Sequence, residues 1–286
     1  MNIGLIPKKW ARLTPNSEAV IDVSTGLRIS YADFDYLIRK LANGLLDLGL
    51  EKGDRVAILS QNSIENIATF YACGRVGLIA QPMNWRLSTP ELLRIIGNGT
   101  PKVLISGDAL ADQKTLLKQQ DTSIQYWFEF GPLGDMSFER LIEKSNDSEP
   151  INSDLIGDDD PFFILYTGGT TGESKGALHS HKSVWYGMLN QTVAERIVPS
   201  DVYMLTGQMF HIPVVLAMNY QAHGCPLVLM NFEPTLALEL ISTEKVSAFL
   251  GVTTMLNWMM AVEDFDSYDL SSLRNIQYGG GPMPSR

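Results

Sequence analysis

The chain has 286 residues, of which 45% are hydrophobic and 19% are charged, and 22 basic against 32 acidic residues give a net charge of −10. These fractions are ordinary for a globular α/β protein with a substantial core, and an acidic chain without a basic stripe argues against a nucleic-acid surface. No apolar run approaches the roughly 18 residues of a membrane span, and residues 1–15 lack the apolar stretch of a signal peptide, so we expect a cytoplasmic protein.

The first half of the chain alternates between helical and strand patterns. Ser30 and Asp33 predict a capping box ahead of a helix whose leucines share one face, and Ser88 with Glu91 predicts a second box. The other expected elements are strands at 55–59, 78–81 and 102–105 and helices at 64–75 and from Pro90 onward. Such alternation predicts an α/β fold with parallel-rich β-sheets sandwiched by helices.

A polar, acidic tract at 143–160 is typical of a connection between subdomains. We therefore predict a first α/β subdomain at 1–157 and a second at 158–286. The expected strands of the second part are 161–166, 202–205, 227–229, 248–250 and 275–277, and its expected helices are 183–195, 214–222, 235–242 and 254–260.

A segment rich in glycine and threonine follows the predicted strand at 161–166. Its glycines let backbone N–H groups face a ligand, its hydroxyls add donors and its lysine adds a point charge, which together suit a polyphosphate. These residues are Thr167, Gly168, Gly169, Thr170, Thr171, Gly172 and Lys175. A Walker P-loop would need lysine directly after Gly172, where Glu173 stands. A surface loop with an incidental lysine is the less favoured alternative.

The order T-G-G-T-T-G-E-S-K-G resembles the phosphate loop of the acyl-adenylate-forming family, which includes acyl-CoA synthetases, luciferases and peptide-synthetase adenylation domains. Ser174 stands where many members of that family have proline. The segments G-D-R-V-A-I and P-M-N-W-R-L-S in the first half resemble acyl-CoA synthetases as well. The resemblance therefore covers nearly the whole chain.

Three later segments also resemble this family: Q-M-F-H, G-V-T-T-M-L and Y-G-G-G-P. The resemblance implies that Phe210 contacts the acid and that His211 lines the active site as a candidate catalytic residue. It implies that Gly251 and Val252 lie beside the acyl pocket. The residues that it places under adenine are Gly279, Gly280, Gly281 and Pro282.

The resemblance further implies ATP and Mg²⁺ as cofactors, coenzyme A as co-substrate and a fatty or other hydrophobic carboxylic acid as substrate. The family's Mg²⁺-binding glutamate and its small C-terminal domain find no match in these residues, so no metal ligand is assigned. We therefore expect the front half of a longer enzyme, inactive in acyl-CoA synthesis by itself. The oligomeric state is left open, with a homo-oligomer among the options.

Other functions remain open at this point. A catalytically incomplete module that binds ATP or an acyl-adenylate is one, and an interaction protein that kept only the fold is another. Among enzymes, an aryl-acid or amino-acid adenylating domain is the alternative. Cys73 and Cys225 lie among apolar residues, so we expect buried free thiols. His179 and His181 are interpreted as a loop-to-helix junction, with no acidic or cysteine cluster to complete a metal site.

Overall fold

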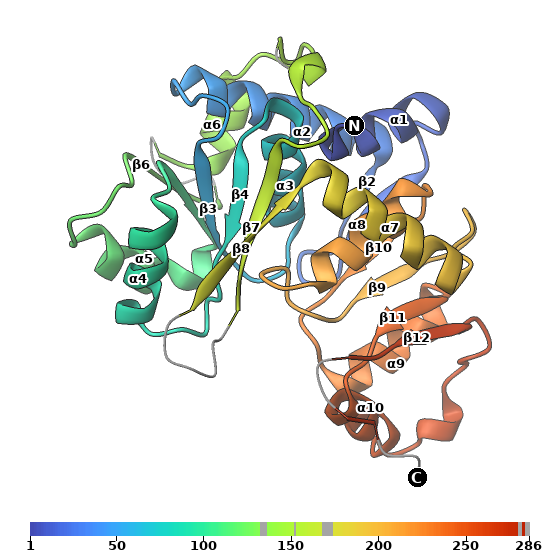
Figure 1. Cartoon of the computed structure of the whole chain (residues 1–286). Helices are drawn as coiled ribbons and strands as arrows, with labels where there is room; N and C mark the ends of the chain where they lie inside the picture. The colour runs from blue at the N-terminus through green and yellow to red at the C-terminus, as the bar shows by residue number, and fades with distance from the viewer. Residues whose placement is uncertain (132–135, 152, 168–173, 280–281, 284–286) are drawn as a thin grey trace.

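The structure is a computed structural model that describes residues 1–131, 136–151, 153–167, 174–279 and 282–283. Its strands form two six-stranded sheets, here called sheet A and sheet B. Figure 1 shows sheet B on the left and strands β9 to β12 of sheet A on the right. Most strand pairs are parallel and helices cover the faces of the sheets, which confirms the predicted fold class.

Sheet A has the strand order β12-β11-β9-β10-β1-β2, and only the pair β1–β2 is antiparallel. Its strands are β1 (Glu18–Asp22), β2 (Leu27–Ser30), β9 (Tyr203–Leu205), β10 (Leu227–Leu229), β11 (Ala248–Leu250) and β12 (Asn275–Gln277). The short strands of the second half lie where the sequence predicts them, to within one residue.

Sheet B has the strand order β6-β5-β3-β4-β7-β8, and only the pair β7–β8 is antiparallel. Its strands are β3 (Arg55–Leu59), β4 (Ile79–Pro82), β5 (Val103–Ser106), β6 (Tyr126–Glu129), β7 (Pro161–Thr167) and β8 (Lys175–Ser180). Strand β8 was not expected from the sequence, which predicts a loop running from 167 to the next helix.

Strand pairing crosses the predicted boundary at residue 158 in both directions. β1 and β2 precede that boundary but pair in sheet A, whose other strands all follow it. β7 and β8 follow the boundary but extend sheet B, whose other strands all precede it. The physical reason is burial: paired with β10, β1 places Val20 in the cluster between the sheets and Ile21 in the cluster under α9 and α10. Whether 1–157 and 158–286 behave as folding units stays a prediction.

The ten α-helices of the described residues are α1 (Ile6–Leu13), α2 (Tyr31–Asp47), α3 (Ile64–Val76), α4 (Thr89–Gly99), α5 (Ala111–Lys118), α6 (Phe138–Lys144), α7 (His181–Glu195), α8 (Pro213–Ala222), α9 (Pro234–Thr243) and α10 (Thr253–Met260). Ser88 and Glu91 form the predicted reciprocal capping box of α4. At α2 the Ser30 hydroxyl accepts the Asp33 N–H and donates to the Asp33 carboxylate. None of these helices is long and apolar enough to cross a membrane.

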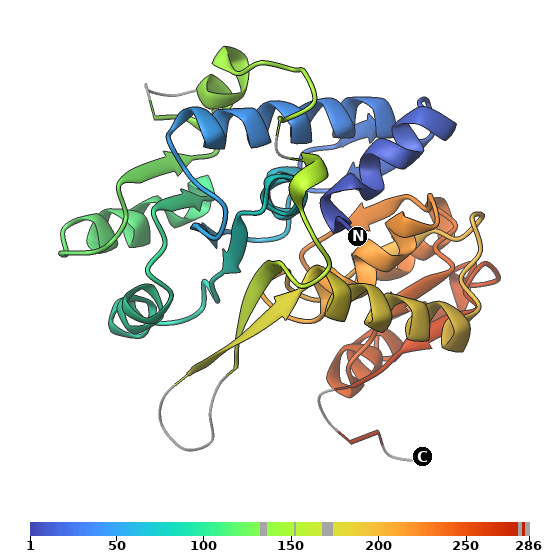
Figure 2. The ribbon, with the colours of Figure 1, turned by 45° about the horizontal axis from the view of Figure 1, so that its top comes forward.

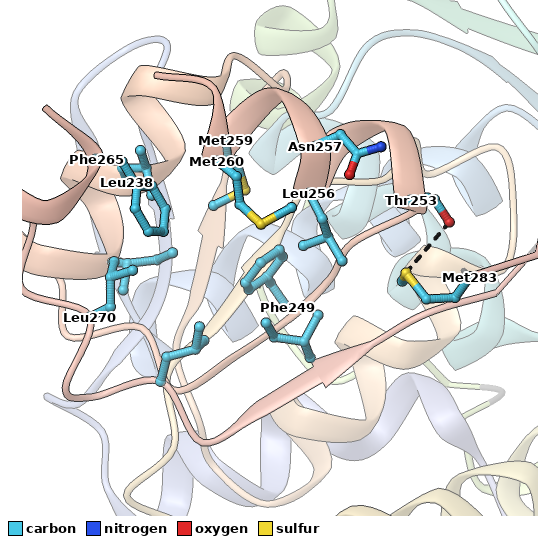
Figure 3. Close-up of a pocket in the computed structure, with 13 residues that line it drawn as sticks. Leu238, Phe249, Thr253, Leu256, Asn257, Met259, Met260, Phe265, Leu270 and Met283 are labelled. Carbon is cyan, nitrogen blue, oxygen red and sulfur yellow. Dashed lines mark hydrogen bonds between the residues drawn. The ribbon is translucent and has the colours of Figure 1, made fainter. Parts of the chain in front are cut away.

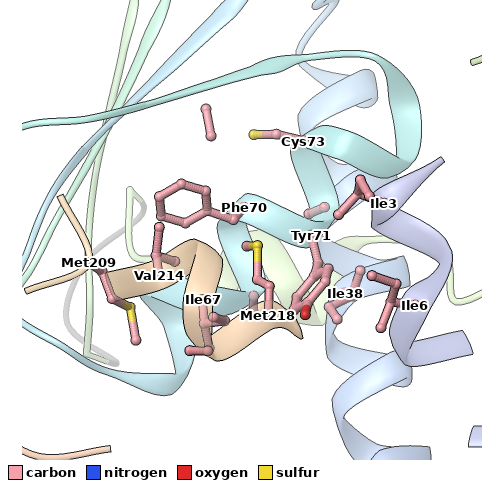
Figure 4. Close-up of a cluster of buried hydrophobic side chains, with 14 of the residues drawn as sticks. Ile3, Ile6, Ile38, Ile67, Phe70, Tyr71, Cys73, Met209, Val214 and Met218 are labelled. Carbon is pink, nitrogen blue, oxygen red and sulfur yellow. The ribbon is translucent and has the colours of Figure 1, made fainter. Parts of the chain in front are cut away.

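The largest cluster of buried side chains lies between the two sheets. Figure 4 shows α1, α2, α3 and α8 contributing Ile6, Ile38, Phe70 and Met218 to this cluster, among others. A second cluster packs α9 and α10 against the far face of sheet A, and a third packs α4 and α5 against the far face of sheet B. The fold is thus a layered arrangement in which each sheet is covered on both faces.

Both cysteines are buried free thiols, as predicted. Burial raises the pKa of Cys73 well above its usual range and raises that of Cys225 to about 12. Neither thiol is therefore a reactive thiolate near neutral pH.

Candidate nucleotide and acid site

Each sequence-predicted site segment follows the carboxyl end of a parallel strand. Thr167 is the last residue of β7, the Phe210–His211 pair follows β9, Gly251 and Val252 follow β11, and Gly279 follows β12. In parallel α/β sheets this edge is where ligands bind, because the connections leave it open for loops. The topology therefore puts all of these segments at ligand-binding edges.

Two side chains of sheet B join its carboxyl edge to that of sheet A. The Asn62 side chain, after β3, donates to the carbonyl oxygens of Gly207 at 2.8 Å and Met230 at 3.0 Å. The Trp85 indole N–H, after β4, donates to Gln208 Oε1 at 2.9 Å. The carboxyl edges of the two sheets thus meet at the turn that follows β9.

Within sheet A, the three candidate segments are bonded to one another. The Thr206 hydroxyl donates to the Leu250 carbonyl oxygen, and the Gly251 N–H donates to the Gln277 carbonyl oxygen at 2.8 Å. The Thr253 hydroxyl donates to the Pro282 carbonyl oxygen at 2.8 Å. The structure therefore brings the segments that carry His211, Gly251 and Pro282 together along one edge.

The Phe210–His211 pair presents one buried and one exposed ring. Phe210 is 8% exposed, and the His211 imidazole is exposed with its ring centre 5.8 Å from that of Phe210. The His211 N–H donates to the Gln208 carbonyl oxygen at 3.1 Å, which closes a tight turn directly before α8. The imidazole is thus exposed at a turn that follows a strand end, and its role at the active site stays a prediction.

The predicted phosphate loop joins the two strands of a β-hairpin. Thr167 and Lys175 face each other as the last register pair of β7 and β8, and both side chains are exposed. Figure 2 shows this end of the hairpin pointing away from α1 and α2. The predicted ligands Gly168, Gly169, Thr170, Thr171 and Gly172 lie outside the described residues, as do Gly280 and Gly281.

The described glycines at the site differ in the space around them. A Cβ added to Gly279 would meet nothing within 4 Å, so the main chain is open to a flat base at this point. A Cβ added to Gly251 would lie 2.6 Å from Leu256 Cδ2, so this glycine is required by packing. The exposed Lys175 ammonium and Thr167 hydroxyl at the hairpin are groups that suit a polyphosphate.

The described residues assign no ligand to a metal ion. Among them, no group of three or more His, Cys, Asp or Glu residues lies close enough to hold one. His181 is instead the first residue of α7, fully buried, with Nδ1 accepting the Ile3 N–H at 3.0 Å and its ring stacked on Phe162 at 5.0 Å. His179 lies in β8 and packs on Phe163.

An apolar cavity of about 330 Å³ lies near the candidate edge but on the other side of sheet A. Figure 3 shows α10 contributing Leu256 and Met260, with Phe249 of β11 below them and Thr253 and Met283 at one end. Phe249 belongs to the cluster under α9 and α10, whereas Met209 of the candidate turn belongs to the cluster between the sheets. The cavity and Met209 thus belong to clusters on opposite faces of sheet A.

Sequence reasoning assigned no role to Asn62 or Trp85, although Trp85 lies in the P-M-N-W-R-L-S segment that resembles acyl-CoA synthetases. Both follow predicted strands by a few residues. Their partners are more than a hundred residues away in the chain, so no local pattern reveals these contacts.

The chain matches the family model "AMP-binding enzyme" over residues 7–286. It is 33% identical over 288 residues to the long-chain-fatty-acid–CoA ligase FadD13 of Mycobacterium tuberculosis, covering 99% of this chain and 56% of the relative. It is 30% identical to the feruloyl-CoA synthase of an Amycolatopsis species, covering 99% of this chain and 55% of that protein. The chain thus spans a little over half the length of these curated relatives.

Solved structures agree with this assignment. The inhibitor-bound N-terminal domain of FACL13 from Mycobacterium tuberculosis superposes with a TM-score of 0.93 at 32% identity, covering 99% of this chain and 71% of that domain. ATP-bound MatB from Rhodopseudomonas palustris superposes with a TM-score of 0.82 at 26% identity, covering 99% of this chain and 56% of that one. By sequence and by fold, the chain belongs to the AMP-binding enzyme family and corresponds to its N-terminal part.

Proposed function

We propose that the protein to which this chain belongs activates a carboxylic acid with ATP and transfers the acyl group to coenzyme A. The observation that carries the proposal is the position of the predicted nucleotide and acid segments at the carboxyl ends of strands in two sheets, which Asn62 and Trp85 join. The relatives with the printed names of acyl-CoA ligases support the same reaction class.

In the proposed first step, a carboxylate oxygen of the acid attacks the α-phosphorus of ATP, and the bond to pyrophosphate breaks. Two anions must be held in line, and negative charge grows on the leaving pyrophosphate. The Lys175 ammonium and the Thr167 hydroxyl supply a cation and a donor at the hairpin, which suits that charge. In the second step the thiol sulfur of coenzyme A attacks the acyl carbon, and AMP leaves.

The proposed substrate is a fatty acid, which lies against the Phe210 side of sheet A beside Gly251 and Val252. Long-chain fatty acids are named for the relative at 33% identity. An aromatic acid is the second candidate, favoured by the names of the feruloyl-CoA synthase and of an indoleacetate–CoA ligase that is 31% identical over 90% of this chain.

The test is acyl-CoA formation by the native gene product with a panel of fatty, aryl and amino acids. We expect turnover with fatty acids, and a Lys175→Ala change that lowers kcat/KM about 100-fold, the scale of one lost transition-state donor. Lys182→Ala is the matched control, since Lys182 is an exposed lysine on α7 whose charge lies 3.8 Å from exposed Asp159. Equal losses in the two variants, or turnover restricted to amino acids, would contradict the proposal.

The face on which the acid lies is tested separately. Phe210→Ala is expected to raise KM for the acid several-fold, because a buried ring of the candidate turn is lost. Met260→Ala, on the wall of the cavity across the sheet, is expected to leave KM unchanged. The reverse pattern would place the acid in that cavity.

A further inference from the structure

Asn62 forms hydrogen bonds to main chain in two segments, the turn after β9 and the residue that follows β10. It is 4% exposed and follows β3 of sheet B. Its amide nitrogen donates to the carbonyl oxygens of Gly207 and Met230, and its amide oxygen accepts the Met209 N–H at 3.0 Å. Three of the four bonds that an asparagine side chain can form are therefore made to the backbone of sheet A.

The turn that Asn62 contacts is tightly packed but has few bonds of its own. Its Thr206 end is bonded to the Leu250 carbonyl oxygen of the next strand, and its far end closes through the His211 N–H. A Cβ on Gly207 would lie 2.4 Å from Pro213 Cγ, so the backbone rests directly on the start of α8. Asn62 holds Gly207 and Met209, and Met209 immediately precedes the Phe210–His211 pair.

Trp85 holds the residue between them. Its indole N–H donates to the Gln208 side chain, from the loop that follows β4. β4 is also the strand that pairs with β7, the first strand of the phosphate hairpin. The hairpin is thus part of sheet B, and the two residues that reach the turn lie in connections that follow its strands β3 and β4.

We propose that Asn62 and Trp85 are positioning residues that set the Gly207–His211 turn of sheet A relative to the phosphate hairpin of sheet B. The inference rests on the proposed function, in which the acid is held by one sheet and the triphosphate by the other. An in-line attack requires the reacting atoms to be aligned closely, and a misplacement of about 1 Å costs ~100-fold in rate. Neither residue touches the reacting atoms; each acts through the turn.

The perturbation is Asn62→Asp, which keeps the size and the acceptor for Met209 but replaces two N–H donors by a carboxylate facing two carbonyl oxygens. The matched control is Asn43→Asp. The Asn43 amide nitrogen, on α2, also donates to two backbone carbonyl oxygens, those of Asn146 at 2.8 Å and Ser148 at 2.9 Å. Both partners lie in the acidic tract at 143–160. Each change deletes two hydrogen bonds from an asparagine side chain to backbone carbonyl oxygens, but only Asn62→Asp affects the Gly207–His211 turn.

Two readouts separate positioning from stability. In the native gene product, Asn62→Asp is expected to lower kcat ~100-fold with KM for ATP little changed, and Asn43→Asp to leave both constants near wild type. In the 4-fluorophenylalanine-labelled chain, Asn62→Asp is expected to move or broaden the Phe210 fluorine resonance, which Asn43→Asp leaves in place. The Phe210 signal is identified by its loss in Phe210→Leu.

The outcomes are distinguishable. An inactive wild-type protein refutes the proposed function, while the fluorine readout still tests the position of the turn. An unmoved Phe210 resonance in folded Asn62→Asp, or equal kinetic losses in both variants, overturns the inference. If Asn62→Asp does not fold, Trp85→Phe removes the indole N–H donor, keeps an aromatic ring and is expected to move the same resonance; an unchanged resonance there overturns the inference as well.

Discussion

The buried guanidinium of Arg75 offers the sharpest test of what holds the first half together. Arg75 is fully buried, and it donates to Glu149 at 2.9 and 2.6 Å and to Asp35 at 2.7 Å. It connects α3 to α2 and to the acidic tract before β7. Removing one partner of a buried ion pair typically lowers the free energy of unfolding by about 3–5 kcal/mol, because the remaining buried charge is left without a partner.

The expected loss in Arg75→Met lies at the lower end of that range, about 3 kcal/mol. Both carboxylates keep a second cation, because Asp35 is bonded to Arg39 at 3.0 Å and Glu149 lies 3.1 Å from Lys8. Methionine also fills much of the space of the arginine stem, so little is added for a cavity.

Arg28 is the matched control for burial. It too lies between two carboxylates, donating to Glu18 at 2.5 and 3.0 Å and to Glu244 at 2.9 and 3.0 Å, but its side chain is 44% exposed. Since exposed pairs contribute little, Arg28→Met is expected to cost less than about 1 kcal/mol. Urea unfolding of both variants measures the difference. If Arg28→Met lowers the free energy of unfolding as much as Arg75→Met does, the loss depends on the number of hydrogen bonds and not on burial, which contradicts the prediction.

Three further predictions follow from other residues. Burial, with the charge of the amino terminus, lowers the pKa of His181 from 6.5 to about 4. Its contribution to stability is therefore present above pH 6.5 and is lost as pH falls towards 4. In His181→Gln the free energy of unfolding should depend less on pH between these values. Gly97→Ala in α4, where a Cβ meets nothing within 4 Å, should stabilise by about 1 kcal/mol in urea unfolding, and Gly207→Ala should destabilise. Residues 158–286 expressed alone should give no cooperative unfolding transition, since sheet A would lack β1 and β2; a cooperative transition would contradict this.

The sequence predicted elements well where one face is buried and the pattern is periodic. α2 and α3 and the strands β3 and β10 lie where apolar residues recur with helical or strand spacing. β8 was missed for a physical reason: four of its six residues are exposed, because the hairpin extends beyond the cover of the helices, so no alternation marks it. α1 was not predicted because it is only eight residues long; it packs against α2 and α8.

The candidate site was predictable only in part. Residues in short local motifs could be proposed from the sequence, and residues that act through contacts distant in sequence could not. Phe210, Gly251 and Gly279 could be proposed because each lies in a short segment with a recognisable order of residues. Asn62 could not be found in this way, because its partner Gly207 lies 145 positions later and the bond exists only once two sheets have packed. The resemblance predicts which residues meet the ligand, and the tertiary structure adds Asn62 and Trp85, which hold one of the predicted segments.

The exchange of strands between the sheets explains why so few side chains are needed for that task. The chain enters sheet A as β1 and β2, builds most of sheet B, completes it with β7 and β8 and then returns to sheet A. Each sheet is therefore anchored to the other by chain on both sides of the shared core, and their relative freedom is small before any polar contact forms. Because the two sheets are already held by their shared core, the bonds of Asn62 and Trp85 need only position the turn and need not hold the sheets together. Their loss should therefore affect the geometry of the turn more than the stability of the fold.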